Sequence, residues 1–402
     1  MVQSILQAAT DKAVFDAINQ HKVTKDEILD MFFSRGVIVS KKTDKDELAK
    51  EFSSFFHSYH DYDQLSSILG VNNRKEKLTS YTLETSLKAS DVESSIKKIK
   101  DKIIKQGATV EHRVLKDGKK IELTITYQVL NLSKNDFQQI SIRDAVMTIE
   151  ETDNGLDIQH PQNKKLSDIS NDVIDVLEGK DSSLQKDEIE LSAFEKPEDR
   201  CKFFDYLTKG IEGFICKDVT DTYVLNPNKK ITSGQTTEVH ITSASLKGTG
   251  VNLSDELKNL HKQGFHTWRV IWKAVKKNND SSDLYVFEAQ FSDAEECKDF
   301  SFIVKGSYKR KDEGIVGDVL GHNVNRTPVP LIEEDQLNKL INKSAWSAIE
   351  KLSAAYATEG DENDNTEKQV VSAKSWTLSF RYCWKNKRLY IWAIRPFWIW
   401  FD

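Results

Sequence analysis

The stretch "ATVEHRVLKDGKKIELTITYQVL" (Ala108–Leu130) decides the fold, because it holds two strand-like runs joined by a short turn. Its Asp117–Gly118 pair is a strong β-hairpin signal, since glycine readily adopts the positive φ angle that such a turn requires. Valine, isoleucine, threonine and tyrosine recur in both runs, as is typical of strands. The stretch therefore predicts two neighbouring antiparallel strands.

A helix and further strands surround this hairpin. The segment "DVESSIKKIKDKIIKQG" (Asp91–Gly107) repeats apolar residues at helical spacing and ends at a glycine. Upstream, "SYTLETSLK" (Ser80–Lys88) predicts a strand, and downstream "DAVMTIEETDNGLDIQH" (Asp144–His160) predicts a second hairpin. The helix "KLSDISNDVIDVLEGK" (Lys165–Lys180) closes a first α+β module over residues 79–180.

Residues 236–356 repeat this order of elements and predict a second α+β module. A strand and a helix come first, three strands follow, and a long helix (residues 333–356) closes the module. The first helix of each module ends in Lys-Gln-Gly, at residues 105–107 and 262–264. A shared order of elements at this spacing is the mark of an internal duplication.

This order of elements is similar to one half of the TATA-binding-protein fold and to helix-grip ligand-binding domains. The resemblance implies a curved antiparallel sheet wrapped around a long helix. Such a sheet can lie on DNA, enclose a small apolar ligand or serve only as a scaffold. We therefore expect an α+β protein with two tandem modules and leave these three uses open.

Other segments complete the predicted organisation. Residues 1–72 predict a small helical module, and residues 181–235 predict an acidic linker followed by a helix over Arg200–Ile215. Residues 357–369 are polar and acidic, which is typical of a mobile connection. Residues 370–402 predict an aromatic C-terminal hairpin.

The N-terminal module centres on "TKDEILDMFFSRGVIVSKKTDKDELAKEF" (Thr24–Phe52). Thr24 and Glu27 have the spacing of a capping box, which satisfies two free amides at a helix start. Asp44, with Glu47 three residues later, marks a second helix start after the extended "VIVS". The pattern predicts helix, extended connection and helix.

This stretch resembles the SAP and HeH family of helix–extended loop–helix modules over residues 24–56. The residues that carry the resemblance are "EIL", "RGVIVSKKT" and "KDELAKEF". It implies nucleic-acid binding in which Arg35, Lys41, Lys42 and Lys45 contact phosphates. Positive and negative residues number seven each between Lys22 and Glu51, so the alternative is a helical cap that docks another protein or domain.

A local surplus of positive charge follows in the first module. Only Asp101, Glu111 and Asp117 are acidic between residues 97 and 120. The basic residues there, which we predict to bind phosphates, are Lys97, Lys98, Lys100, Lys102, Lys105, Arg113, Lys116, Lys119 and Lys120. The alternative interpretation is a solvated helix face.

The C-terminal segment is unusually aromatic. We predict a partner-binding surface from five of its tryptophans: Trp376, Trp384, Trp392, Trp398 and Trp400. Tryptophan is enriched among the residues that dominate binding energy at protein interfaces. A sheet edge packed onto the second module, a membrane-interface belt and stacking on single-stranded nucleic acid remain as alternatives.

Motifs for catalysis, metal binding and cofactor binding are missing from the sequence. Asp283 and Glu288 in "DLYVFEAQF" offer weak candidates for a nuclease, which would need a lysine that this stretch lacks. The four cysteines have no Cys-x-x-Cys spacing, and the first residues do not read as a signal peptide. We expect a cytoplasmic protein with no membrane span, no metal and no cofactor.

The net charge of −6 means that any nucleic acid must be bound by a local patch rather than by the whole molecule. The first hypothesis is a non-enzymatic, nucleic-acid-associated protein that acts within a larger complex. One alternative is a protein-interaction or sensor subunit of a microbial antiviral defence assembly. Another is a nuclease or ligand-binding domain built on the second module.

Overall fold

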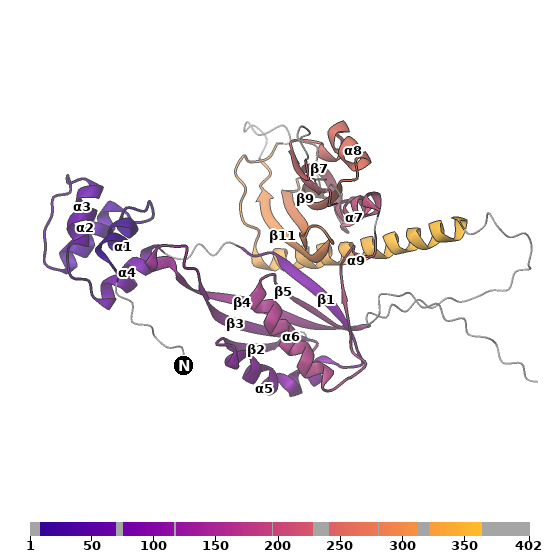
Figure 1. Cartoon of the computed structure of the whole chain (residues 1–402), viewed down its shortest axis with the longest axis horizontal. Helices are drawn as coiled ribbons and strands as arrows, with labels where there is room; N and C mark the ends of the chain where they lie inside the picture. The colour runs from indigo at the N-terminus through magenta and orange to yellow at the C-terminus, as the bar shows by residue number, and fades with distance from the viewer. Residues whose placement is uncertain are drawn as a thin grey trace, which may run out of the picture. The chain divides into compact units, whose positions relative to one another are not determined.

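The computed structural model describes residues 9–69, 75–115, 118–194, 196–227, 241–279, 281–311 and 321–363 (Figure 1). The chain divides into two units, Met1–Ser353 and Ala354–Asp402. Helix α9 (Leu331–Asn363) starts in the first unit and ends in the second. The predicted aromatic hairpin and its five tryptophans lie outside the described residues.

Four short helices form the N-terminal module: α1 (Asp11–Ile18), α2 (Lys25–Ser34), α3 (Lys45–Ser53) and α4 (Tyr59–Leu69). The predicted capping box is confirmed, since the Thr24 hydroxyl accepts from the Glu27 amide and the Glu27 carboxylate accepts from the Thr24 amide. Helix α3 follows Asp44 as predicted, although the Asp44 side chain makes no capping hydrogen bond.

Aliphatic and aromatic residues together build the core of this module. The rings of Phe32 and Phe52 meet edge to face with centroids 5.2 Å apart. Phe137, from the 3-10 helix η1 (Asp136–Gln138), joins the same core and stacks on Tyr62. The module is therefore fixed to the loop between two strands of the sheet rather than tethered only by the chain.

The first half of the sheet is built around the predicted hairpins. Its strands are β1 (Leu78–Glu84), β2 (Thr109–Leu115), β3 (Lys120–Leu130), β4 (Ile140–Thr152) and β5 (Gly155–Pro161). They pair antiparallel in the order β2-β3-β4-β5-β1, so the pairings β2–β3 and β4–β5 confirm both hairpins. Helices α5 (Ala89–Lys105) and α6 (Lys164–Glu178) cover one face with a buried aliphatic core.

The second half of the sheet differs from the predicted repeat. Its elements are α7 (Pro197–Gly210), β7 (Phe214–Leu225), β8 (Ser243–Lys247), η2 (Val251–Leu253), α8 (Asp255–Lys262), β9 (His266–Lys276), β10 (Leu284–Asp293) and β11 (Lys298–Tyr308). Its strands follow the order β11-β10-β9-β7-β8. The opening strand β8 therefore pairs with β7, whereas β1 pairs with the last strand of its own half.

Strand β7 lies in the segment that the sequence predicted as a linker and a helix reaching Ile215. Helix α7 ends at Gly210, and Gly213 has a left-handed φ of 75°, which reverses the chain before the strand. The residues after Gly213 are rich in β-branched and aromatic side chains, which favour a strand. The predicted helix therefore stops early, and the predicted linker segment supplies a strand that lies between β9 and the edge strand β8.

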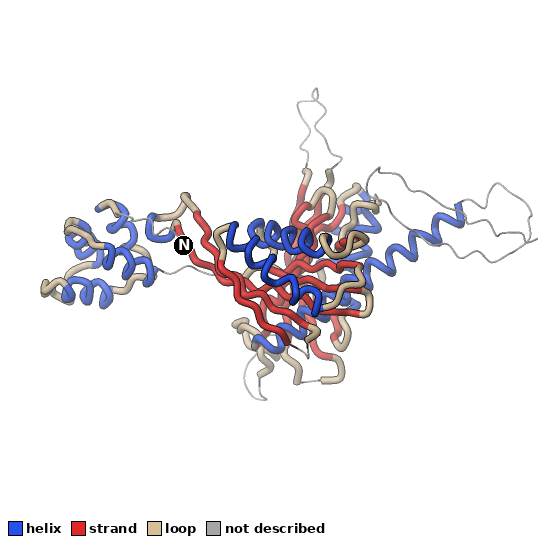
Figure 2. Tube along the Cα trace, turned by 90° about the horizontal axis from the view of Figure 1, so that it is seen from below, coloured by secondary structure: helices blue, strands red, loops and turns tan. Residues whose placement is uncertain are grey.

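The two halves join into one sheet of 11 strands in the described chain. Strand β1 pairs with β11 at Leu78 and Phe302, and further along it pairs with the short β6 (Gln185–Glu188). Figure 2 shows the strands with helices lying across them. The architecture is thus α+β with a large antiparallel sheet, in agreement with the predicted class.

The cores of the two halves lie on opposite faces of this sheet. Leu78 packs against the core of the second half, to which α7 and α9 contribute. Tyr81 and Leu83 belong to the core beneath α5 and α6. Successive side chains of a strand point to opposite faces, so Leu78 and Tyr81 look in opposite directions. Each half consequently presents a polar face on the side away from its core.

Candidate nucleic-acid interface

In the N-terminal module, Arg35 is committed to the structure of the module itself. Its guanidinium lies 2.8 Å from the Asp61 carboxylate, donates to the Phe56 carbonyl at 2.9 Å, and sits 4.7 Å from the centre of the Phe52 ring. Burial and the Arg35 charge lower the pKa of the adjoining His57, which keeps that ring neutral. Arg35 therefore fixes the segment after α3 and is poorly placed to meet a phosphate.

Of the three predicted lysines of this module, one is engaged within the module, as Arg35 is, and two are exposed. Lys45 donates to the Gln20 carbonyl at 2.7 Å, which ties the start of α3 to the turn after α1. Lys41 and Lys42 lie exposed in the turn before α3. Two of the four predicted contacts thus remain available to a ligand.

In the predicted patch on α5 and the β2–β3 hairpin, too, fewer basic residues are available to a ligand than the sequence predicts. Lys102 lies 3.1 Å from Asp175 and 3.4 Å from Asp172, so it joins α5 to α6. Lys120 is only 6% exposed and lies on the sheet face opposite α5. Lys116 lies outside the described residues, Lys100 is half-buried, and the exposed members are Lys97, Lys98, Lys105, Arg113 and Lys119.

A stronger concentration of positive charge occurs where the sequence did not predict it. On β9, Arg269, Ile271 and Lys273 alternate with Val270, Trp272 and Ala274, and the latter three face the core. Arg269 and Lys273 therefore lie on the polar face of the second half. Lys305 of β11 reaches the same face and so does Lys77, just before β1.

Glu288 of β10 stands at the centre of this group and is 2% exposed. Its Oε1 lies 2.7 Å from Lys77 Nζ and 2.9 Å from the Arg269 guanidinium, and its Oε2 lies 2.7 Å from Lys305 Nζ. Three positive charges therefore surround one negative charge. The Arg269 Nε is buried and donates to no described residue.

The electrostatics of this cluster follow from its burial and its charge imbalance. Burial alone would raise the pKa of Glu288, but hydrogen bonds and charges from Lys305 and Lys77 outweigh it and lower that pKa. Burial lowers the pKa of Lys77, and the like charges of Arg269 and Lys305 add to this effect, while Glu288 opposes it. Glu288 is therefore ionised, and an additional anion would relieve the repulsion among its cations.

Aromatic side chains flank the cluster. Tyr223 of β7 lies beneath the Arg269 guanidinium at 4.5 Å and beneath Lys247 of β8 at 5.9 Å. Lys273 lies 5.4 Å from the Tyr308 ring. We call this surface the cationic face and define it by Lys77, Lys247, Arg269, Lys273 and Lys305.

The acids on the cationic face are fewer than its cations. Among the described residues, Glu288 and Asp221 form ion pairs with it, the latter 3.9 Å from Lys247, and Asp218 lies directly across from Lys273 in the β7–β9 register. The face can therefore hold phosphate groups by direct ion pairs, and Arg269 suits them because its planar guanidinium can donate twice. Alternating cations and apolar residues in "WRVIWKAV" were the sequence signal that could have revealed it.

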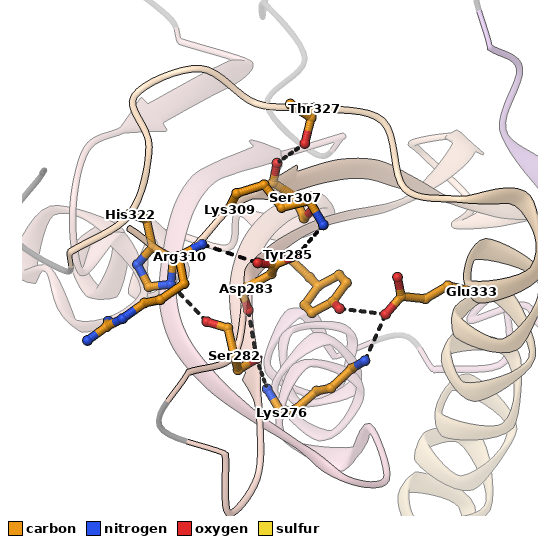
Figure 3. A network of polar contacts seen from close by, with 10 residues as sticks. All are labelled: Lys276, Ser282, Asp283, Tyr285, Ser307, Lys309, Arg310, His322, Thr327 and Glu333. Carbon is orange, nitrogen blue, oxygen red and sulfur yellow. Dashed lines mark hydrogen bonds and ion pairs between the residues drawn. The ribbon is translucent and has the colours of Figure 1, made fainter. Parts of the chain in front are cut away.

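The two weak nuclease candidates do not converge. Asp283 accepts from Lys309 Nζ at 2.6 Å and from the Arg310 amide at 3.2 Å, whereas Glu288 is bound by the cations described above. Figure 3 shows Asp283 within a polar network in which Tyr285 and Lys276 both donate to Glu333 at the start of α9. Burial and Glu333 raise the pKa of Tyr285 to about 12, so this tyrosine stays protonated.

This network ties α9 to the β9–β10 hairpin, and its acids already have cationic partners. Across the part of the chain that the structure describes, no cluster of three or more histidine, cysteine or acidic side chains could hold a metal ion. Metal-dependent cleavage by Asp283 and Glu288 thus finds no support in their geometry.

Comparison of the chain with protein-family models, with curated proteins and with solved structures finds no match. Among the described helices, none is long and apolar enough to cross a membrane.

Proposed function

We propose that this chain is a non-enzymatic, nucleic-acid-associated protein whose cationic face contacts backbone phosphates. The observation that carries the proposal is the cluster at Glu288, where one buried carboxylate holds Lys77, Arg269 and Lys305 close together. An excess of cations held at short range costs electrostatic energy unless an anion neutralises it. A phosphate backbone supplies such anions at regular spacing.

Aromatic rings on the same face favour nucleic acid over an acidic protein. Tyr223 and Tyr308 already lie next to cationic side chains. In single-stranded nucleic-acid sites, cationic grooves follow the backbone while aromatic rings stack on bases. The cationic face thus combines both kinds of contact.

Two resemblances add to this proposal. The N-terminal helices resemble SAP and HeH modules, and Lys41 and Lys42 remain exposed there as auxiliary phosphate contacts. The strand order of the first half, with α5 and α6 on one face, is similar to one half of the TATA-binding-protein fold or to a helix-grip domain. Lys97, Lys98 and Lys105 on α5 would extend the contact on the same side of the sheet.

A second candidate function is a protein-interaction subunit, including a sensor in a microbial antiviral defence assembly. Exposed apolar side chains favour it, because Phe33 is 71% exposed, Ile38 is 86% exposed and Phe56 is fully exposed on the N-terminal module. Co-purification from the native host with wild type and with a Phe33→Ser/Phe56→Ser variant would test it. A partner retained equally by both proteins would contradict this use of the surface.

The experiment for the main proposal measures the fluorescence anisotropy of a labelled oligonucleotide, single-stranded and duplex, at low salt. Lys247→Glu/Lys273→Glu should weaken binding at least about tenfold, because it replaces two attractive phosphate contacts by repulsive ones. Lys247 and Lys273 are suitable because neither contacts Glu288 among the described ion pairs.

The matched control is Lys12→Glu/Lys258→Glu, which makes the same charge change at exposed lysines that pair only locally, with Asp16 and Asp255. This control should bind nearly as well as wild type. Wild-type protein that fails to bind at low salt, or a control that weakens binding as much as the cationic-face variant, would refute the proposal.

A further inference from the structure

A cavity of about 600 Å³ lies between the polar face of the first half and helix α9. Small-molecule sites in proteins have volumes of this order. Its walls come from β1, β3, β4 and β5 on one side and from α9 residues between Asp335 and Glu350 on the other. The cavity lies on the opposite side of the sheet from the cationic face, and its floor belongs to the other half of the sheet.

The floor of the cavity consists of polar residues in cross-strand register. One row runs Lys120, Glu150, Asp157 and Thr82 across β3, β4, β5 and β1. The next row runs Glu122, Thr148, Gln159 and Ser80 across the same strands. Neighbouring strands lie about 4.8 Å apart, so each row offers a line of closely spaced donors and acceptors.

Helix α9 forms the roof of the cavity. One side of the helix packs into the core of the second half, and the other side faces the floor of the cavity. Leu337, Ile341 and Ala345 are buried in the core of the second half. Lys339 and Asn342 point the other way, since Lys339 Nζ lies 2.8 Å from Glu150 Oε2 and Asn342 Oδ1 accepts from the Ser80 hydroxyl at 2.5 Å. Two polar contacts therefore fix the height of the roof above the floor.

Several groups in this cavity retain hydrogen-bonding capacity. Asp157 accepts from Thr82 at 2.7 Å through one oxygen, which leaves the other oxygen free of described partners. The Asn342 amide nitrogen and the side chains of Thr148 and Gln159 make no hydrogen bond to another described residue. Burial raises the pKa of Asp157, Glu150 adds to the increase, and Thr82 and Lys339 oppose it. A donor from a ligand would relieve this carboxylate.

The remaining wall is aromatic. Trp346 lines the cavity one helical turn beyond Asn342 and is partly buried against the core of the second half. Side-chain amides can bind adenine through two hydrogen bonds, and an aromatic ring can stack on a base. We propose that this cavity binds an adenine nucleoside, with Gln159 or Asn342 and Asp157 reading the amino-bearing edge of the base and Trp346 packing on its ring.

The composition of the cavity argues against two other ligand classes. A sterol or fatty acid would cover the second Asp157 oxygen, Thr148 and Gln159 without giving them hydrogen-bond partners, which is costly. A polyanion would meet Glu150, Asp157, Asp335 and Glu350, which outnumber the three lysines of the lining, Lys120, Lys339 and Lys343. An uncharged ligand with several donors and acceptors suits these walls better.

Isothermal titration calorimetry of the full chain with adenosine and with inosine tests this inference. Wild-type protein should bind adenosine and discriminate against inosine, which carries an oxygen in place of the 6-amino group. Asp157→Asn should weaken adenosine binding about tenfold and improve inosine binding, because the new amide can donate to that oxygen. Trp346→Leu should weaken both nucleosides about tenfold.

The matched control is Asp153→Asn, the same change at an exposed residue of the β4–β5 turn, and it should bind like wild type. Lys247→Glu/Lys273→Glu should also leave adenosine binding unchanged, so the result is independent of the cationic face. The proposal fails if adenosine gives no saturable heat at millimolar concentration. It also fails if Asp157→Asn, folded by circular dichroism, binds both nucleosides with unchanged affinity.

Discussion

The two halves of the sheet bury opposite faces. The charged side chains on their polar faces are paired differently. In the first half, Glu150 is paired with Lys339 from α9, and Asp157 accepts from Thr82. In the second half, Glu288 alone holds three cations. The first arrangement is close to balanced, whereas the second carries a surplus of positive charge.

This difference in charge balance indicates which kind of ligand each face would bind favourably. A balanced face offers hydrogen bonds and shape, and it suits an uncharged molecule. A face with surplus cations gains most from an anion, because repulsion among its cations is relieved on binding. The net charge of −6 conceals this contrast, since it averages over both faces.

The largest expected effect comes from Glu288→Gln, which removes the anion that holds the cationic face together. Three cations would then remain half-buried without their partner, and breaking such buried pairs costs about 3–5 kcal/mol. Chemical denaturation at neutral pH should show this loss in the free energy of unfolding. Added sulfate or phosphate should restore part of the lost free energy of unfolding. The reference is chloride at the same ionic strength.

Glu296→Gln is the control for this change, because Glu296 is exposed and its one ion pair within the described chain is with Lys298, at 3.8 Å. It should alter stability by less than about 0.5 kcal/mol. Equal effects of the two substitutions would show that Glu288 does not organise the face.

A smaller effect is expected for Asp157→Asn, and its pH dependence should have the opposite sign. The pKa of Asp157 is raised in the folded protein, so the ionised carboxylate disfavours folding at neutral pH and protonation favours it. The variant should therefore be equally stable or more stable at pH 7, by less than about 1 kcal/mol. Its advantage should shrink as the pH falls through the raised pKa.

Glu288 provides the comparison across the same titration. Its pKa is lowered on folding, so its contribution is complete above the ordinary carboxyl pKa and disappears as the pH falls through the lowered value. The deficit of Glu288→Gln relative to wild type should therefore be constant above the ordinary carboxyl pKa and shrink as the pH falls below it. Parallel pH profiles for the two variants would remove the proposed contrast between the halves.

Local signals made much of the fold predictable. The hairpins at β2–β3 and β4–β5 and the capping box at Thr24 rest on residues close together in sequence, and all of them are confirmed. Strand β7 was missed because its start depends on Gly213, which sits inside a stretch that otherwise continues a helical pattern. The pairing of β1 with β11 joins distant residues, and no local pattern encodes it.

The candidate site was less predictable for the same reason. Arg35 and Lys102 were expected to be free, but each has an acidic partner that only the packing of helices brings near. Glu288 was noticed as an acid, while its partner Lys77 precedes a strand of the other half. Counting charges along the chain cannot separate cations that hold the fold from cations that remain available.

The salt dependence of nucleic-acid binding tests the central claim most directly. Each lost phosphate contact reduces the slope of log affinity against log salt by about one. Lys247→Gln/Lys273→Gln should therefore reduce the wild-type slope by about two, while Lys97→Gln/Lys98→Gln should change it less. A slope that is unchanged by the first pair and reduced by the second would place the interface on α5 and contradict the account.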